Sequence, residues 1–395
     1  MPNLVDSAWV TIVIKKSKFA NKFGKLILSD GSVFDGMGFG YSTTTFGEIV
    51  FNTGMVGYTE TLTDPSYNGQ ILTLTYPLIG NYGVPDPAVK VDGIPEFFES
   101  DKIQTNGLVV HELSLTASHW NLVMTLDEWL HNEKIPGIAG IDTRELTKKL
   151  RHSGVMMSAL AVSENEIDEN ELKRKLESAP NYNDEKFMDS VSTKHIQKIG
   201  NKPKNVVLID TGVKNAIIRN ILDIGYNVVK VPWDTSIEEI LKHDPKGVVI
   251  SNGPGDPQNC PDTVSTAKSL IENNIPTLGI CLGAQILGIA GDAKTYKLKY
   301  GHRGQNKPCV NLDNNQVYVT SQNHGYCINP DSLKNSKFNL WFSNVDDKTV
   351  EGIIHENKKC IAVQFHPEAS PGPYDCKFIF EELKNIMEEG GSDKT

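Results

Sequence analysis

Residue patterns predict an α/β protein of two domains. An N-terminal α+β, strand-rich domain would precede a C-terminal domain built on a doubly wound, mainly parallel sheet. From residue 205 onward, short apolar runs alternate with amphipathic segments, as in βαβ units. Before residue 163, strand-like runs dominate and this alternation is absent. The 395 residues suffice for more than one hydrophobic core.

The composition argues against several classes of protein. Hydrophobic residues make up 39% and charged residues 22% of the chain, an ordinary globular balance. The net charge of −10 argues against a general affinity for nucleic acid or anionic membranes. No apolar run approaches the roughly 20 residues that span a bilayer. The six cysteines form no CxxC pair, which favours reduced thiols in a cytoplasmic protein over disulfides or a zinc site.

The N-terminal domain is expected over residues 24–162. It begins with a β-hairpin whose turn is Asp30-Gly31, a strong turn signal between two apolar runs. Further strands are predicted over 48–51, 70–75 and 107–111, and helices over 126–132 and 141–150. Segments 57–67 and 77–85 are rich in turn-forming residues, so we expect loops there.

Three segments are expected outside the domains. Residues 1–23 are predicted to be a poorly ordered extension, and a transit peptide is the alternative because the segment is mildly basic. Residues 163–204 are highly charged, so we interpret them as a linker with one surface helix over 166–176. Residues 390–395 are predicted to be a tail.

The C-terminal domain is expected over residues 205–389. Its predicted strands cover 206–210, 227–231, 247–251, 277–280, 316–320 and 361–364, and its helices cover 214–223, 237–242, 263–273, 284–290 and 378–389. Ligands of parallel sheets bind beyond the carboxyl ends of the strands. Ser251 and Cys281 both lie at such ends, so the loops that follow them would share one crevice.

Cys281 is the candidate nucleophile. It stands between Gly279 and Gly283, where a predicted strand turns into a predicted helix. A nucleophile elbow needs this layout, because glycines on either side allow the tight bend that exposes the middle side chain. The helix N-terminus would also direct its free N–H groups toward the sulfur. The alternative is a structural cysteine, since free cysteines are commonly buried.

A cysteine nucleophile needs a base and a trap for the oxyanion. His366 follows a predicted strand, and Glu368 lies close enough to orient its imidazole, which would complete a Cys-His-Glu triad. The alternative for this tripeptide is a solvated turn. The Gly-rich loop 251–257 and the N–H of Leu282 would supply the oxyanion donors. The alternative for the loop is an ordinary turn.

These motifs occur in one order along the chain, and together they resemble the class I (triad) glutamine amidotransferases. They are Gly-Ile-Cys281-Leu-Gly with Gln285, Asn252-Gly-Pro-Gly-Asp-Pro257 and His366-Pro-Glu368. Segments in the N-terminal half narrow the resemblance to the small, glutamine-hydrolysing subunit of carbamoyl-phosphate synthase. They include Leu62-Thr-Asp-Pro-Ser66-Tyr67, Thr75-Tyr-Pro-Leu-Ile-Gly-Asn-Tyr-Gly83 and Ile141-Asp-Thr-Arg144. The likeness runs from about residue 24 to the last helix.

The resemblance implies a reaction and a set of site residues. Cys281 would attack the side-chain amide of L-glutamine, His366 would act as base and then protonate the leaving ammonia, and Glu368 would orient His366. The implied glutamine contacts are Ser66, Gly253, Gly255, Leu282, Gln285, Asn323, Gly325 and Tyr326. Ser66 would come from the N-terminal domain, which gives the two domains a reason to pack together.

The resemblance also implies a partner. A large subunit would use ATP and Mg²⁺ to make carbamoyl phosphate from bicarbonate and ammonia, for arginine or pyrimidine synthesis or both. The pair would be a heterodimer, open to higher assembly, with effector control on the large subunit. This chain itself would hold no cofactor and no metal. The alternatives are a free-standing γ-glutamyl amidase or hydrolase, and a non-catalytic assembly subunit in which Cys281 is inert.

Some residues depart from the family pattern or carry weaker signals. Ala284 stands where many relatives carry His, and Tyr326 replaces a frequent Phe, so we expect tuning and not loss of activity. The basic run 294–303 is interpreted as a solvated face, with a partner-facing surface as the alternative. His324 is expected to be a structural neighbour of Asn323.

Overall fold

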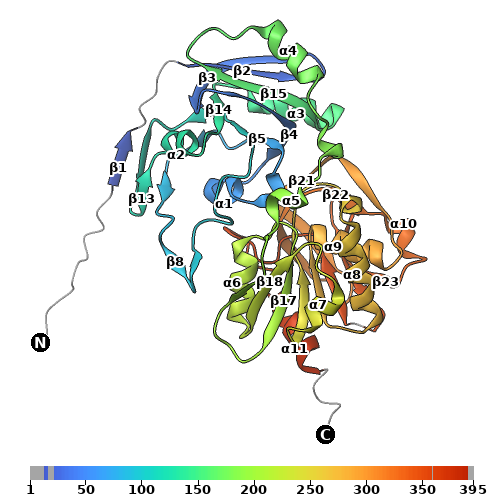
Figure 1. Cartoon of the computed structure of the whole chain (residues 1–395). Coiled ribbons are helices and arrows are strands. Elements are labelled where there is room, and N and C mark those ends of the chain that lie inside the picture. Colours follow the sequence, from blue (N-terminus) through green and yellow to red (C-terminus); the bar gives the residue numbers. More distant parts are fainter. Residues whose placement is uncertain (1–12, 17–21, 358, 390–395) are drawn as a thin grey trace, which may run out of the picture.

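The protein consists of a strand-rich N-terminal unit packed on a C-terminal unit with a central sheet (Figure 1). This computed structural model describes residues 13–16, 22–357 and 359–389. The predicted tail and most of the predicted N-terminal extension lie outside the described residues. Within that extension, however, β1 (Val13–Lys16) is a strand that pairs antiparallel with β12 (Thr116–His119).

The N-terminal unit is a closed barrel, a feature that the sequence analysis did not predict. Neighbouring strands follow the order β10-β14-β3-β2-β15-β4-β5. Their bounds are β2 (Lys22–Leu28), β3 (Val33–Gly40), β4 (Thr44–Asn52), β5 (Gln70–Leu74), β10 (Gly107–Val109), β14 (Pro136–Ala139) and β15 (Met156–Ser163). Leu26, Ile49 and Leu160 are fully buried members of one core cluster. Closure into a barrel leaves no strand edge unpaired.

Local signals placed several elements of this unit correctly. The hairpin between β2 and β3 turns at Gly31, whose φ of 86° suits glycine. Helix α2 (Leu126–Asn132) begins with a capping box, in which Thr125 and Glu128 satisfy each other's backbone N–H groups. Helix α3 (Thr143–Ser153) is capped by Asp142.

Other predictions for this unit were wrong in detail. Helix α1 (Tyr58–Leu62) and the 3-10 turn η1 (Pro65–Tyr67) occupy the first of the two predicted loops. The second loop contains two short strands. The short strands of this unit are β6 (Leu78–Ile79), β7 (Val84–Pro85), β8 (Lys90–Val91), β9 (Ile94–Pro95), β11 (Glu112–Leu113) and β13 (Leu122–Met124).

The segment 163–204, predicted to be a linker, is folded and partly buried. Helix α4 (Glu169–Glu177) confirms the predicted surface helix, but it buries Leu172 and Leu176 against the barrel. The residues that follow form η2 (Tyr182–Asp184) and α5 (Met188–Val191), whose apolar side chains join the core of the C-terminal unit. Strand β16 (Gln197–Ile199) is an edge strand of the C-terminal sheet. The few apolar residues of the segment are therefore enough to fix it in place.

The C-terminal unit is built on a ten-stranded sheet in the order β16-β18-β17-β19-β20-β25-β24-β23-β21-β22. The strands not yet given are β17 (Asn205–Asp210), β18 (Asn227–Pro232), β19 (Pro245–Ile250), β20 (Thr277–Ile280), β21 (Thr295–Asn311), β22 (Val317–Ile328), β23 (Phe338–Asn344), β24 (Val350–His355) and β25 (Cys360–Val363). The block β18-β17-β19-β20-β25 pairs in parallel, and every other neighbouring pair is antiparallel. The prediction of a mainly parallel sheet therefore holds for this block and is wrong for the sheet as a whole.

Helices cover both faces of this sheet, as a doubly wound architecture requires. They are α6 (Asn215–Asp223), α7 (Ile237–Leu241), α8 (Pro261–Glu272), α9 (Leu282–Ala290) and α11 (Phe378–Glu389), with the shorter η3 (Pro257–Asn259) and α10 (Pro330–Leu333). Successive side chains of a strand point to opposite faces. Along β17, Val207 packs with α8 and α9, whereas Val206 packs with α6 and α11.

None of the helices in the described ranges is long and apolar enough to cross a membrane.

Candidate active site

Cys281 occupies a sharp bend between β20 and α9. Its φ of 55° and ψ of −103° are rare for a residue with a side chain. A Cβ on Gly279 would lie 2.6 Å from the carbonyl oxygen of Gly283, and a Cβ on Gly283 would lie 2.1 Å from that of Ile250. Only glycine fits at either position. The predicted strand–bend–helix layout is therefore present.

His366 and Glu368 follow strand β25 and are both buried. The backbone N–H of His366 donates to the carbonyl of Ser321, which fixes the position of the histidine. His366 Nδ1 lies 2.7 Å from Glu368 Oε1. The buried ammonium of Lys214 lies 3.1 Å from the same carboxylate oxygen, so Glu368 accepts from two cationic groups.

The remaining ring nitrogen of His366 faces Cys281. Nε2 is buried and has no hydrogen-bond partner within the described ranges. Burial lowers the pKa of His366, but the Glu368 carboxylate and the adjacent Cys281 outweigh burial and raise it to about 10. Burial raises the pKa of Glu368, yet Lys214 and His366 outweigh burial and lower it to about 2. A raised pKa for His366 and a lowered pKa for Glu368 are both expected when a carboxylate is paired with an imidazolium.

A cavity opens beside Cys281. All eight implied glutamine contacts line this cavity together with Cys281. They are Ser66, Gly253, Gly255, Leu282, Gln285, Asn323, Gly325 and Tyr326. His366 and Glu368 lie behind Cys281 and do not line the cavity wall.

The cavity is closed by both units of the protein. Ser66 belongs to η1 of the barrel unit, and its hydroxyl accepts a 2.9 Å hydrogen bond from Asn252 of the C-terminal unit. The amide of Asn323 donates to Asp64 at 2.9 Å, also across the junction. Arg219 forms an ion pair with Glu99 at 2.8 Å, which adds a third link.

The loop 251–257 approaches the cavity closely. A Cβ on Gly253 would lie 1.9 Å from the carbonyl oxygen of Thr211, so no other residue fits there. The side-chain amide of Gln285 is held by the carbonyl of Tyr326 at 2.9 Å. Ala284 is buried in a core cluster of the C-terminal unit and does not line the cavity.

Several polar residues of the cavity wall escaped the sequence analysis. They are Glu48, Gln70, Tyr182, Lys297, Arg303 and His324. The interpretation of 294–303 as a solvated face is wrong for Lys297 and Arg303, because the segment is part of β21 and the barrel unit covers it. The sequence showed their charge but gave no sign of what covers them. His324 was noted as a neighbour of Asn323, and its Nδ1 contacts the carbonyl of Tyr326.

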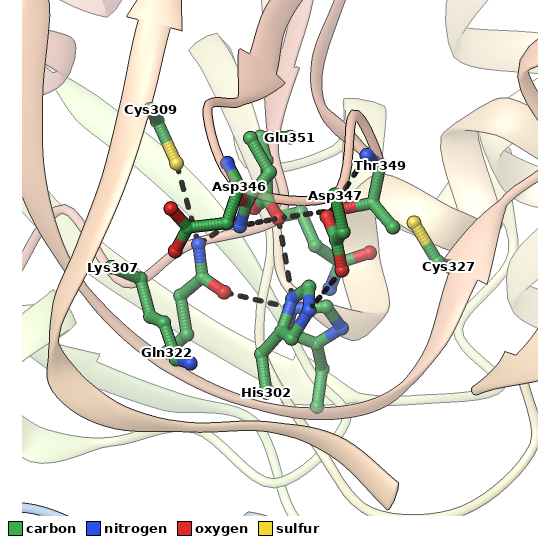
Figure 2. Close-up of polar contacts among 12 residues, drawn as sticks. His302, Lys307, Cys309, Gln322, Cys327, Asp346, Asp347, Thr349 and Glu351 are labelled. Atoms are coloured by element: carbon green, nitrogen blue, oxygen red, sulfur yellow. Dashed lines mark hydrogen bonds and ion pairs between the residues drawn. The ribbon is translucent and has the colours of Figure 1, made fainter. Parts of the chain in front are cut away.

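A second buried histidine–carboxylate cluster lies nearby in the C-terminal sheet (Figure 2). His302 Nε2 lies 2.8 Å from Asp347, and its Nδ1 lies 3.4 Å from Glu351. Glu351 also accepts from Gln322 at 2.9 Å and from Thr349 at 3.1 Å. The sequence analysis assigned no metal, but the fold brings ligand atoms of His302, His324 and Glu351 within 4.8 Å of one another. Because protein groups already contact these atoms, an ion-pair network explains the cluster.

Comparison with known proteins identifies the family. Residues 26–160 match the family model of the carbamoyl-phosphate synthase small chain, CPSase domain, and residues 207–386 match that of class-I glutamine amidotransferases. The carbamoyl phosphate synthase small chain of Pyrococcus furiosus is 46% identical over 374 residues, covering 93% of this chain and 98% of that protein. The chain belongs to the carbamoyl-phosphate synthase small-chain family.

Other relatives give the same family name. The carbamoyl phosphate synthase small chain of Methanopyrus kandleri is 44% identical over 366 residues, covering 92% of this chain and 99% of that protein. Among solved structures, a glutamine amidotransferase of Thermotoga maritima is 18% identical with a TM-score of 0.34, covering 49% of this chain and 87% of that one. The class I amidotransferase model covers the unit that holds Cys281, His366 and Glu368.

Proposed function

We propose that this chain is the glutaminase subunit of a carbamoyl-phosphate synthase. It hydrolyses L-glutamine through a thioester on Cys281 and passes the ammonia to a large subunit. One observation carries the proposal: the free nitrogen of a buried, carboxylate-bound His366 faces a strained Cys281 beside a cavity that all eight implied glutamine contacts line. Family membership supports it independently.

The first half of the reaction forms the thioester. His366 Nε2 takes the thiol proton of Cys281, and the resulting thiolate attacks the side-chain carboxamide carbon of glutamine, so that a C–S bond forms while the carbonyl electrons move to oxygen. The proton that His366 holds on Nε2 passes to the nitrogen of the leaving group. The C–N bond then breaks, ammonia departs and a γ-glutamyl thioester remains on Cys281.

Backbone donors would stabilise the oxyanion of this step. Leu282 is the first residue of α9, where an N–H has no partner inside the helix. The N–H of Gly253 is the second candidate, because this glycine allows the loop backbone to approach the cavity. Preorganised N–H donors of this kind contribute roughly 3–4 kcal/mol of transition-state stabilisation.

The second half of the reaction releases glutamate. Water occupies the position that ammonia has left, and His366 Nε2 takes its proton. The resulting hydroxide attacks the thioester carbon, a C–O bond forms and the C–S bond breaks. Glu368 and Lys214 keep the imidazole in one orientation throughout.

The partner would be the large subunit of the synthase. It would use ATP and Mg²⁺ to make carbamoyl phosphate from bicarbonate and this ammonia, for arginine or pyrimidine synthesis or both. We infer a heterodimer in the cytoplasm, with no cofactor in the small chain. The relatives are named as small chains, which supports the inference of a large-subunit partner. The residues that line the cavity support glutamine as the substrate.

The test is glutaminase activity measured on the chain alone and with a co-expressed large subunit. Wild-type protein should release ammonia and glutamate in equal amounts, and Cys281→Ser should abolish this release. Full glutamine-dependent synthesis by Cys281→Ser would refute the proposal. High activity alone without a stable partner would favour a free-standing amidase. An intact complex that never hydrolyses glutamine would favour an assembly subunit.

A further inference from the structure

In the wall of the cavity, one buried donor and one buried acceptor have no hydrogen-bond partner among the residues that the structure describes. One is Nε of Arg303, on a residue that is 4% exposed, and the other is Oε1 of Gln70, on a residue that is 3% exposed. An unpaired buried donor or acceptor is costly, so such atoms call for an explanation. Neither residue is among the contacts that the family resemblance implies.

Arg303 is a buried cation without a carboxylate. Within the described part of the chain its guanidinium forms no ion pair, and it donates one hydrogen bond, from Nη1 to the carbonyl of Tyr300 at 2.8 Å. Its Nη2 lies 3.4 Å from the position of a Cβ on Gly325, so the guanidinium lies against this cavity residue. Lys297, the other cation of the wall, is by contrast occupied by Glu48 and Asn183.

A guanidinium in this position suits one part of an amino acid. Its planar donors match the two oxygens of a carboxylate, which makes arginine the usual partner for that group. The side-chain amide of glutamine must approach Cys281, so the α-carboxylate would extend away from the sulfur, toward another part of the wall.

Gln70 presents an acceptor beside a negative charge. Its Nε2 donates to Glu48 Oε2 at 2.9 Å. A carboxylate only accepts hydrogen bonds, so the amide nitrogen must face Glu48 and the carbonyl oxygen is left free. An ammonium group supplies the donors that this carbonyl oxygen can accept.

We propose that Arg303 binds the α-carboxylate of glutamine and that the Gln70 carbonyl accepts from its α-ammonium. The pocket would thereby select a free amino acid with both charged groups intact. This proposal rests on the proposed function and names two residues that determine its specificity. Arg303 comes from the C-terminal unit and Gln70 from the barrel, so recognition needs both units in place.

The test measures the activity of two variants on glutamine and on two altered substrates. The variants are Arg303→Met and Gln70→Met. The substrates are L-glutaminamide, in which a carboxamide replaces the α-carboxylate, and glutaric acid monoamide, which lacks the α-amino group. Ammonia release gives kcat and KM for each pair, on the chain in complex with its large subunit. Thermal unfolding of each variant reports whether the fold is intact.

Each variant should lose the preference for one charged group of glutamine only. Arg303→Met should lose the preference for the α-carboxylate, and Gln70→Met should lose the preference for the α-ammonium. Wild-type protein should prefer glutamine over glutaminamide by about 10- to 100-fold in kcat/KM. Arg303→Met should reduce this preference to about threefold or less, mainly through KM, and keep the preference over glutaric acid monoamide. Gln70→Met should reduce the preference for glutamine over glutaric acid monoamide and keep the preference over glutaminamide. Arg303→Lys, which keeps the charge, should retain part of the carboxylate preference.

Arg219→Met is the matched control. This arginine also lies at the junction of the two units, but Glu99 already pairs with it and it does not line the cavity. Its loss should leave both substrate preferences unchanged. If Arg303→Met lowers the rates on all three substrates by the same factor, its role is structural and the proposal is overturned.

Direct binding provides a second readout. The Cys281→Ser protein should bind glutamine at least tenfold more tightly than glutaminamide by calorimetry, and adding Arg303→Met should remove the difference. Equal binding of the two ligands by Cys281→Ser would overturn the assignment of Arg303. Failure of the proposed function would look different, because wild-type protein would then release no ammonia from glutamine.

Discussion

Two buried histidine–carboxylate clusters lie in the same C-terminal sheet, and they differ in how many ring nitrogens face a carboxylate. His302 has a carboxylate at each ring nitrogen, Asp347 at 2.8 Å and Glu351 at 3.4 Å (Figure 2). His366 has Glu368 at Nδ1. Nε2 of His366 and Nδ1 of His302 both lack a hydrogen bond within the described residues, but the first lies beside Cys281 and the second faces the carboxylate of Glu351. Nearby carboxylates raise the pKa of both histidines against the effect of burial.

The difference shows that a shifted pKa alone does not mark a catalytic histidine. His302 is enclosed between the carboxylates of Asp347 and Glu351, so its ion pairs stabilise the sheet. His366 keeps one nitrogen available next to a nucleophile, so it can transfer a proton. The comparison therefore predicts that removing His366 affects the rate, and that removing His302 affects the stability.

The largest expected effect is on the rate of His366→Gln. Without the proton-transferring nitrogen, kcat for glutamine hydrolysis should fall by about 10³-fold, equivalent to roughly 4 kcal/mol of barrier height. Steady-state ammonia release measures it, with protein folding checked by circular dichroism. A decrease of less than tenfold in a folded variant would show that His366 is not the base.

His302→Gln should instead lower the free energy of unfolding by about 3 kcal/mol, because it leaves Glu351 buried without its cation. Urea denaturation followed by fluorescence measures this change. The kcat of the folded fraction should stay within about tenfold of the wild-type value. A loss of activity as large as that of His366→Gln, with unchanged stability, would contradict the contrast between the clusters.

A smaller effect is expected for Glu368→Gln. The amide can still contact the imidazole but cannot stabilise its charge, so kcat should fall by about 100-fold, or roughly 2.7 kcal/mol. Asp347→Asn is the matched change in the other cluster, and its half-exposed side chain predicts a loss of stability below about 1 kcal/mol without a comparable change in kcat. Equal effects of the two changes on kcat would argue against the assigned roles.

The smallest effect is a pH dependence of stability. The pKa of His302 is raised above its ordinary value of 6.5, because the partnering carboxylates outweigh burial. Its contribution is therefore complete below pH 6.5 and is lost as the pH rises through the raised pKa. The stability difference between wild-type protein and His302→Gln should shrink as the pH rises from 6 to 9. A difference that grows with pH would show the opposite sign of the shift.

The residues around Cys281 could be predicted because their signals are local. Gly279 and Gly283 flank the nucleophile within the same short segment, and the packing confirms that no side chain fits at either position. His366 and Glu368 are likewise two residues apart, so a short motif is enough to bring their side chains together. Most elements of the C-terminal unit follow from its alternating apolar pattern for the same reason.

The rest depended on contacts that no local pattern specifies. Strand β2 pairs with β15 and strand β3 pairs with β14, so the barrel closes through partners that are distant in sequence. Arg303 and Lys297 appear in the sequence only as charges of a basic run. They become cavity residues because the barrel unit covers β21.

Labelling with a diazo-ketone analogue of glutamine tests the central claim most directly, namely that Cys281 is the nucleophile of a glutamine pocket. All six cysteines are buried and free, so burial alone does not distinguish Cys281 from the others. Mass spectrometry should find one adduct, on Cys281, which excess glutamine prevents and which His366→Gln slows. An adduct on another cysteine such as Cys309, or no adduct at Cys281 in folded protein, would contradict the account.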